Sequence, residues 1–279
     1  MEHPAAAYNS DRDEYLIVWE DYRATTQTVY GHIVTVQGQP VGADFAIPNP
    51  WSHIQFRPRV AYDSIRQQYA VLWAEQNEAR LDLYLQLLSV SGQPVGDATL
   101  ITPYLRHING LDLAYNSRRG EYLVLWSDDN GPERPLARRV STTGELLGTA
   151  PLVISASAYA SLRVVYNPDA DEYLMAWGID NGTYGVDIIG KRVLNNPSTA
   201  SGLETATGPV IPIASNRLGE QGLFFTATYN PTINEYLVAW PDTIDEQMSN
   251  NNNIYGVRLN GMSGAVIGAT FPIYSAAGN

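Results

Sequence analysis

The aromatic residues best suited to hold a ligand lie outside the apolar segments of the chain. Trp51 and Tyr104 each stand eleven residues before a recurrent tyrosine, Tyr62 and Tyr115 respectively, and Tyr159 lies in the next connection of the same kind. Large aromatic side chains in loops often face a partner, and their flat rings stack on the apolar C–H faces of sugars. Alternatively, each ring folds down onto the edge of its own sheet.

Three charged residues occupy a second repeated position, three residues before a recurrent tyrosine. They are Arg59, Asp112 and Arg163. Guanidinium and carboxylate groups form paired hydrogen bonds to neighbouring hydroxyls, so this set suits the floor of a carbohydrate site. The same alternation of sign would also suit salt bridges between neighbouring units of the fold. The sequence leaves both interpretations open.

Acidic residues gather after each repeated tryptophan. They are Glu20, Asp21, Glu75, Asp128, Asp129, Asp180 and Asp242. Calcium needs about six to eight converging oxygens, and the chain has no EF-type loop. We therefore expect solvated loop acids and no cofactor, and a calcium site is the weaker alternative. His53 and His107 lie in neighbouring connections and suit zinc, but no third ligand is evident.

A fivefold repeat must position all these residues. Its anchor tyrosines are 54, 53, 51 and 63 residues apart, and its tryptophans keep the same spacings: Tyr8, Tyr62, Tyr115, Tyr166 and Tyr229, with Trp19, Trp73, Trp126, Trp177 and Trp240. Periods of this length, each holding several short strands, indicate propeller blades or a stacked array. In the second repeat we expect strands at residues 58–63, 68–74, 81–90 and 98–101.

The second strand of each repeat decides between these architectures. Along residues 122–126, Tyr, Val and Trp lie on one face and two leucines on the other, so both faces are apolar and both need cover. Twisted sheets packed face to face provide that cover without helices. The sequence therefore predicts one all-β domain over residues 1–279, a five-bladed β-propeller with four antiparallel strands per blade. The blades are expected at residues 3–48, 56–102, 110–155, 161–214 and 224–275.

The turn after the first strand begins with Asn in four repeats and with Asp63 in the second. Such a side chain bonds its own backbone and tolerates left-handed geometry, so we expect a structural role for it. The repeated Tyr and Trp are expected to pack between blades rather than to bind a ligand. Residues 194–207 and 250–253 are expected to be surface insertions.

The pattern AYNSxxxEYLVxW, followed by YGxxV and GxPVG, covers nearly the whole chain. It resembles repeats of large, exported bacterial proteins that are largely uncharacterised. More distantly, the blade is similar to that of TolB-type propellers, whose WSPDG turn stands where YNSxxD stands here. The resemblance implies a propeller-type repeat and carries over no functional residue.

The charge balance limits the partners. Seventeen Lys and Arg stand against 29 Asp and Glu, and the net charge of −12 repels nucleic acid and anionic membranes. No apolar segment approaches the roughly 20 residues of a membrane span, and no signal peptide is recognisable. We expect a monomeric domain taken from a longer extracellular or cell-surface protein.

The sequence favours a non-enzyme. Five-bladed glycoside hydrolases place paired carboxylates near the axis, but the matching positions here offer only Asp112, which flanking arginines would keep ionised. The chain has no cysteine, and no GxSxG, P-loop, dinucleotide or HExxH motif is present. The expected function is a binding module for a ligand, such as a glycan, at the face of the loops that join one blade to the next, around the central channel. The alternatives are a protein-interaction or spacer propeller and, third, a glycoside hydrolase.

Replacing Trp126 with Ala should lower the free energy of unfolding by about 3–5 kcal/mol, the range for deleting a large buried aromatic side chain. Trp51→Ala should cost far less, because Trp51 stands outside the repeat. Urea denaturation of both variants measures the difference. Equal losses of unfolding free energy in the two variants would mean that the assignment of Trp126 to the core and of Trp51 to a loop is wrong.

Overall fold

The computed structural model describes residues 2–23, 25–49, 52–77, 80–128, 133–158, 161–182, 185–205, 209–215, 219–220, 224–242 and 253–274. All regular secondary structure in these ranges is β-strand. They contain no helix of the length and hydrophobicity that crossing a membrane requires. Trp51 and Tyr159, two of the predicted ligand-binding residues, lie outside the described residues.

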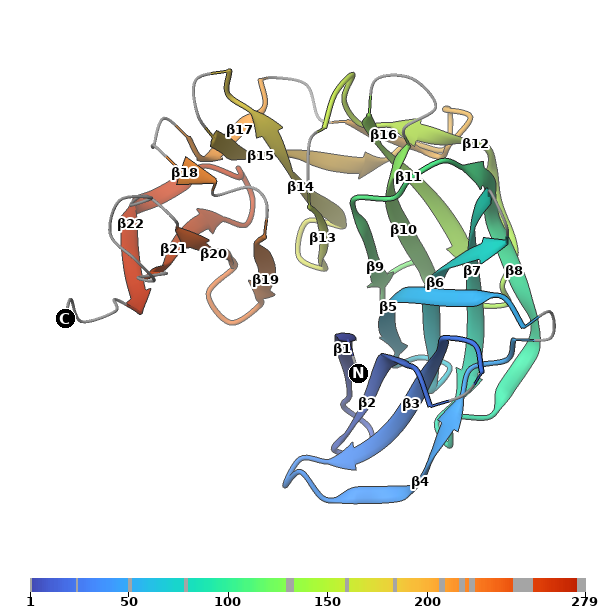
Figure 1. The fold of residues 1–279 in the computed structure, drawn as a ribbon. Coiled ribbons are helices and arrows are strands. Elements are labelled where there is room, and N and C mark those ends of the chain that lie inside the picture. Colours follow the sequence, from blue (N-terminus) through green and yellow to red (C-terminus); the bar gives the residue numbers. More distant parts are fainter. Residues whose placement is uncertain are drawn as a thin grey trace. The chain divides into compact units, whose positions relative to one another are not determined.

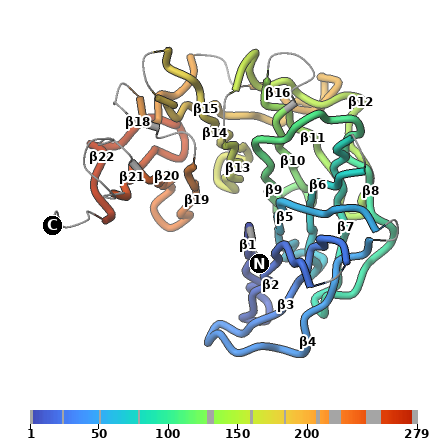
Figure 2. The backbone as a smooth tube through the Cα atoms, in the orientation of Figure 1, coloured from blue at the N-terminus to red at the C-terminus, as the bar shows by residue number. Residues whose placement is uncertain are grey.

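The strands form five sheets, the blades of a five-bladed β-propeller (Figures 1 and 2), as the sequence predicts. Within each blade consecutive strands pair antiparallel, except that β17 and β18 both pair with β15, β18 in parallel. Blade 1 consists of β1 (Glu2–Asn9), β2 (Glu14–Asp21), β3 (Thr28–Thr35) and β4 (Pro40–Ala46). Blade 2 consists of β5 (Ile54–Asp63), β6 (Gln68–Asn77), β7 (Arg80–Ser89) and β8 (Pro94–Leu105).

The other three blades repeat this order. Blade 3 consists of β9 (Leu111–Asn116), β10 (Glu121–Asp128), β11 (Arg134–Ser141) and β12 (Leu146–Val153). Blade 4 consists of β13 (Leu162–Asn167), β14 (Glu172–Asp180), β15 (Gly185–Asn195), β16 (Leu203–Thr205), β17 (Ile211–Ala214) and β18 (Gly219–Glu220). Blade 5 consists of β19 (Thr226–Asn230), β20 (Glu235–Asp242), β21 (Asn253–Asn260) and β22 (Val266–Tyr274).

In blade 4 the outer strand is divided. β16 pairs with one end of β15, at Val193–Asn195, and β17 pairs with the middle of the same strand, at Ile188–Gly190. The expected surface insertion at residues 194–207 is therefore wrong in part, because Leu203 begins β16 and is fully buried. Burial of its apolar side chain away from water stabilises this pairing.

Contacts divide the chain into two compact units. Unit 1 comprises Met1–Ile108, Asp112–Val124 and Arg138–Gly148, and unit 2 comprises Asn109–Leu111, Leu125–Ala137 and Thr149–Asn279. The strands of blade 3 are each divided between the two units, and each unit is described by itself.

In unit 1, blades 1 and 2 share one apolar core. Leu16 and Val18 of β2 pack in the same buried cluster as Tyr69, Val71 and Trp73 of β6. The residues of each strand alternate between its two faces, so these sets are the facing sides of two neighbouring sheets. The predicted packing of the repeated Tyr and Trp between blades is confirmed for Tyr69 and Trp73.

Unit 2 contains the equivalent core between blades 4 and 5. Leu174 and Ala176 of β14 join Tyr236, Val238 and Trp240 of β20 in one buried cluster. All five repeated tryptophans are buried, including Trp126, which is 2% exposed. The repeated tyrosines of the second strands are fully buried in four blades, and Tyr15 of blade 1 is 37% exposed. The anchor tyrosines of the first strands are half-buried, and Tyr8 is 44% exposed.

The turns after the first strand have the expected hydrogen bonds. The side-chain oxygen of Asn9 accepts from the backbone N–H groups of Asp11 and Arg12 at 3.0 and 3.2 Å. Asp63, Asn116 and Asn167 each accept the same two bonds, and the first of them recurs at Asn230. The left-handed backbone conformation is adopted four residues after this position, at Asp13, Gln67, Gly120, Asp171 and Asn234. The reason is that the chain must reverse there to enter the second strand.

At the outer edge, the last strand of one blade contacts the turn between the third and fourth strands of the next. The pairs are Phe45 with Gly92, Thr99 with Gly144, Thr149 with Ala200, and Ile211 with Gly264. The tightest is Phe45 over Gly92, where a Cβ atom would lie 2.3 Å from Cζ of the ring. Glycine is thus required at position 92 for two reasons, since its φ is also +79°.

Gly92→Ala should lower the free energy of unfolding by about 2–4 kcal/mol, because left-handed strain adds to overpacking. Gly96→Ala is the matched control, since its φ is +68° but nothing lies within 4 Å of the added carbon. It should cost only about 1–2 kcal/mol. In a Phe45→Ala background the cost at position 92 should fall to the control value in urea titrations. If that cost does not fall, the Phe45 ring is not its cause.

Candidate functional site

The charged residues at the repeated position of the first strand are engaged within the protein. Arg59 of β5 lies 3.6 Å from Asp112 of β9, measured from Nε to Oδ1, and both side chains are mostly buried. A guanidinium nitrogen of Arg59 also donates to the Pro58 carbonyl at 2.8 Å. This ion pair joins blades 2 and 3, as expected if these residues are inter-blade salt bridges.

Arg163 repeats this geometry in unit 2. Its guanidinium donates to the Leu162 carbonyl at 2.6 Å and lies 5.7 Å from the centre of the Phe225 ring, in the segment that leads to β19. Arg59 therefore reaches the first strand of the following blade, and Arg163 reaches the residue just before it. A ligand at this position would have to compete with these contacts.

Tyr104 lies apart from the Arg59–Asp112 pair. It is near the end of β8, it is 59% exposed, and the guanidinium of Arg80 stacks on its ring at 4.9 Å. Its backbone N–H donates to Asp82, and its φ of +68° turns the chain there. Strands β6 and β7 separate β8 from β5, which corresponds to about 14 Å of sheet. The structure does not bring Tyr104 to Arg59.

The acids after the tryptophans differ from expectation in blades 1 and 2. Glu20, Asp21 and Glu75 are buried, so the prediction of solvated loop acids is wrong for all three. Each is held by hydrogen bonds that replace water. Asp180 is exposed as predicted and accepts from the backbone N–H of Gly182. Asp129 and the side chains of Asp128 and Asp242 lie outside the described residues.

Glu20 and Asp21 lie at the end of β2 and form hydrogen bonds with neighbouring segments. Glu20 accepts from Nδ1 of His3 at 2.8 Å, from the Gln27 amide at 2.8 Å and from the backbone N–H of Arg57 at 2.7 Å. Asp21 accepts from the Trp19 indole, and the guanidinium of Arg23 beside it holds the pKa of the Asp21 carboxyl well below its usual range. Both acids have structural partners that explain their burial.

Glu75 differs from these two acids because it lines a cavity. Its carboxylate accepts from Nδ1 of His53 at 2.9 Å and from the Trp73 indole at 3.3 Å, and the residue is 3% exposed. His53 is fixed in turn by Asn49, whose side chain exchanges two hydrogen bonds with the His53 backbone at 2.6 and 3.0 Å. The connection between β4 and β5 therefore positions the imidazole on Glu75.

This cavity, the Glu75 pocket, has a volume of about 710 Å³ in unit 1. Its described lining residues come from the β4–β5 connection and from blade 2: Pro48, Asn49, Trp73, Glu75, Gln86, Pro94, Gly96, Asp97 and Ala98. The Trp73 indole stacks on Tyr84 with centroids 5.9 Å apart. Because Trp73 is only 1% exposed, the open apolar lining is supplied mainly by Pro48, Pro94 and Ala98. An apolar surface beside a few fixed polar groups is typical of small-molecule sites of 300–1,000 Å³.

The sequence contained a signal for this pocket. An acid follows the repeated tryptophan by two positions in both Trp19-x-Asp21 and Trp73-x-Glu75, and both acids accept from that indole. The pattern predicts an acid turned back onto the core rather than into solvent. The pattern does not predict the cavity beside Glu75, because Pro48 and Asn49 of the β4–β5 connection form part of its lining.

The described residues contain no group of three or more His, Cys, Asp or Glu side chains placed to hold a metal ion. His53 is bonded to Glu75, and His107 is an exposed residue after β8. These two histidines therefore do not form a zinc site with a described third ligand.

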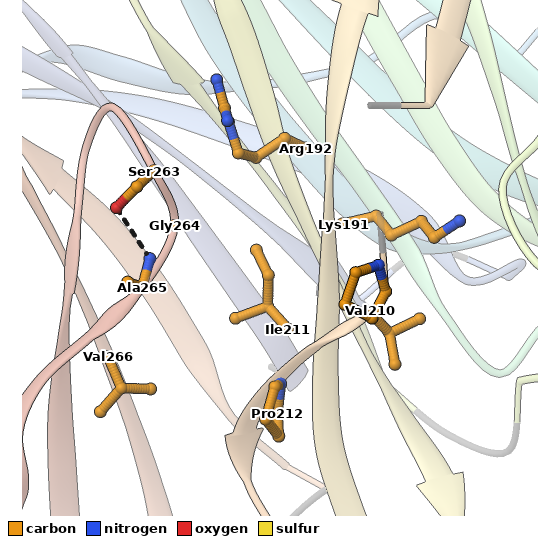
Figure 3. A pocket seen from close by; sticks show the side chains of 10 residues that line it. Lys191, Arg192, Val210, Ile211, Pro212, Ser263, Gly264, Ala265 and Val266 are labelled. Atoms are coloured by element: carbon orange, nitrogen blue, oxygen red, sulfur yellow. Dashed lines mark hydrogen bonds between the residues drawn. The ribbon is translucent and has the colours of Figure 1, made fainter. Parts of the chain in front are cut away.

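A second pocket lies in unit 2, with a volume of about 400 Å³. It is bounded by β15, by residues 209–212 and by the turn at residues 263–266. Figure 3 shows Lys191 and Arg192 extending away from each other on β15. Arg192 is held by both oxygens of Glu172 at 2.5 and 2.6 Å, which neutralises its charge. The remaining lining is mainly apolar, and we regard this pocket as part of the packing between blades 4 and 5.

These sheets and seams define the chain as a β-propeller module. No family model and no curated protein matches it. It is similar in structure to a protein of unknown function from Dyadobacter fermentans, with a TM-score of 0.61 and 9% identity over 96% of this chain and 82% of that one.

Two further solved structures are similar. Hydrazine synthase from Kuenenia stuttgartiensis gives a TM-score of 0.57 at 10% identity over 92% of this chain, which spans 64% of that protein's length. An endo-arabinase from Bacteroides thetaiotaomicron gives 0.54 at 12% identity over 100% and 95% of the two chains. At these identities the likeness shows the fold alone.

A double-mutant cycle tests whether Arg59 and Asp112 interact as an ion pair. Arg59→Ala and Asp112→Ala should show a coupling free energy of about 0.5–1 kcal/mol in urea unfolding, because both groups are partly withdrawn from solvent. The coupling should fall as NaCl is raised. A coupling near zero would favour a ligand-binding role for these residues.

Proposed function

We propose that this chain is a non-catalytic binding module that takes a carbohydrate in the Glu75 pocket. A sugar needs an aromatic or apolar surface for its C–H face and fixed polar groups for its hydroxyls. The observation that carries the proposal is one cavity that offers both, with the apolar residues Pro48, Pro94 and Ala98 beside the polar residues Glu75, Gln86 and Asn49.

Glu75 is suited to hold a hydroxyl in a fixed position. An ionised carboxylate has about four acceptor sites on its two oxygens. Those of Glu75 receive His53 and Trp73, which leaves further acceptor capacity. Because these contacts orient the carboxylate before a ligand arrives, little ordering entropy is lost on binding.

The indole of Trp177 shows that a repeated tryptophan can be buried without an acid. Ile179 stands where Glu75 stands in blade 2, and Nε1 of Trp177 has no hydrogen-bond partner among the described atoms. The acid is therefore not required to form the blade. This supports a binding role for Glu75 in addition to its bond to Trp73.

The pocket adjoins the face on which a ligand was expected from the sequence. Asn49 belongs to the same connection as Trp51, which stays a predicted ligand contact two residues further on. Arg59, Asp112, Arg163 and Tyr104 already have partners in the protein. We therefore centre the proposed site on Glu75 rather than on those side chains.

The test is a glycan array with the purified chain, followed by calorimetry on any ligand found. Glu75→Gln should weaken binding by at least tenfold, about 1.4 kcal/mol, because the substitution removes the charge and one acceptor oxygen. Glu20→Gln is the matched control: another buried glutamate with three partners, but outside the pocket. It should leave affinity within about twofold, a difference of about 0.4 kcal/mol.

Two other results would redirect the proposal. Equal losses in the two variants would mean that Glu75 acts through stability and not through the ligand. Because Glu75 and Asp97 line one cavity, chromatography of incubated oligosaccharides would detect hydrolysis by such a pair. Cleavage would contradict a non-catalytic module, and an array without ligands would favour a protein-interaction propeller.

A further inference from the structure

One polar side chain of the Glu75 pocket shows which hydrogen-bonding groups the cavity offers. Gln86 is 2% exposed, and its amide nitrogen donates to three backbone carbonyls at 3.0, 3.3 and 3.1 Å, those of Leu87, Val95 and Gly96. Only an NH2 group can face three carbonyls, so these bonds fix the orientation of the amide. The amide oxygen Oε1, to which no described residue bonds, is therefore the group that Gln86 can offer to a ligand.

The other side-chain donors of the described lining are largely engaged as well. The Trp73 indole donates to Glu75, and the Asn49 amide donates to a backbone carbonyl at 2.6 Å. The second amide proton of Asn49 is the one such donor in the described lining that has no acceptor in the described chain. Pro48 and Pro94 lack even a backbone N–H. The pocket is therefore poor in hydrogen-bond donors.

Hydrogen-bond acceptors, by contrast, remain available. The Glu75 carboxylate has about four acceptor sites, and His53 and Trp73 use two of them. Asp97 is exposed at the rim of the pocket, and no described residue bonds to its carboxylate. Together with Oε1 of Gln86, three side chains of the lining can therefore accept hydrogen bonds from a ligand.

The same lining disfavours a negatively charged ligand. The described lining residues include no lysine or arginine. Asp82 lies opposite Glu75 in the register of β6 and β7, and it adds a third carboxylate to this face of blade 2. Burial raises the pKa of the Tyr84 hydroxyl, and the charges of Glu75 and Asp82 raise it further, as a negative potential requires. A ligand carboxylate would meet this potential without a guanidinium or ammonium partner in the described lining.

We infer that the Glu75 pocket takes a neutral sugar, that it accepts hydrogen bonds from the hydroxyl groups of that sugar, and that it rejects acidic sugars. The inference rests on the proposed carbohydrate function and adds the chemistry of the ligand to it. Glu75 and Gln86 lie about four positions apart along the sheet, roughly 13 Å, so they contact different hydroxyls of an oligosaccharide. A uronate carboxylate has no proton to donate to them.

Selection by charge is tested with a glycan array that includes β-1,4-linked tetrasaccharides of glucose, mannose and galactose and the same chains oxidised to uronates at C6. Only neutral glycans should bind. Calorimetry at about pH 8, where histidine side chains usually carry no charge, should show a neutral form binding at least about tenfold tighter than its uronate. The ratio should fall to about threefold in about 500 mM NaCl, because exposed charges are screened.

Recognition of hydroxyl protons is tested with monodeoxyfluoro analogues of the neutral glycan that binds, because fluorine replaces a hydroxyl group at similar size but has no proton to donate. At least one analogue should bind about tenfold more weakly. Asp97→Asn removes one negative charge and adds an amide donor, so it should reduce the ratio between neutral and uronate forms to about threefold. Asp180→Asn is the matched control at an exposed acid of blade 4, and it should keep the ratio.

The outcomes separate this inference from the proposed function. An acidic glycan that binds as tightly as its neutral form, or fluorinated analogues that all bind within about twofold of the parent glycan, overturns the inference and leaves the carbohydrate function standing. Equal effects of Asp97→Asn and Asp180→Asn would mean that the net charge of the chain selects the ligand, and they also overturn it. An array on which no glycan binds overturns both proposals.

Discussion

The structure depends on one constraint: the second strand of every repeat is apolar on both faces. Leu16 and Val18 can leave water only if another sheet covers them, and β6 supplies that cover with Tyr69 and Trp73. The same relation recurs between β14 and β20. Because no helix of the described chain is available for the purpose, blades must cover blades.

Polar contacts then fix the spacing of neighbouring blades. The Asn167 side chain satisfies its own turn and also donates to the Gly261 carbonyl of the next blade at 2.8 Å. In unit 1 the Gln68 amide reaches the Thr142 carbonyl at 2.7 Å. Such bonds are directional, so they specify a distance and an orientation that hydrophobic packing alone leaves open.

Differences among the repeats create the site. The position two residues after the tryptophan is Asp21 in blade 1, Glu75 in blade 2 and Ile179 in blade 4. The Asp21 carboxylate forms a salt bridge with Arg23. The Glu75 carboxylate accepts hydrogen bonds from His53 and the Trp73 indole, and it lines a cavity. One repeated position thus serves structure in one blade and lines a cavity in another.

The sequence by itself determined the fivefold repeat, the strands and the burial of the tryptophans, because these follow from local spacing and from apolar faces that must be covered. It also identified the turn residues that bond their own backbone. The tertiary structure alone decided that Arg59 pairs with Asp112, that two strands separate Tyr104 from Arg59 and that Glu75 lines a pocket. These relations join residues of different strands and blades. Their geometry depends on how side chains pack between neighbouring blades, and the spacing of residues within one repeat does not specify that packing.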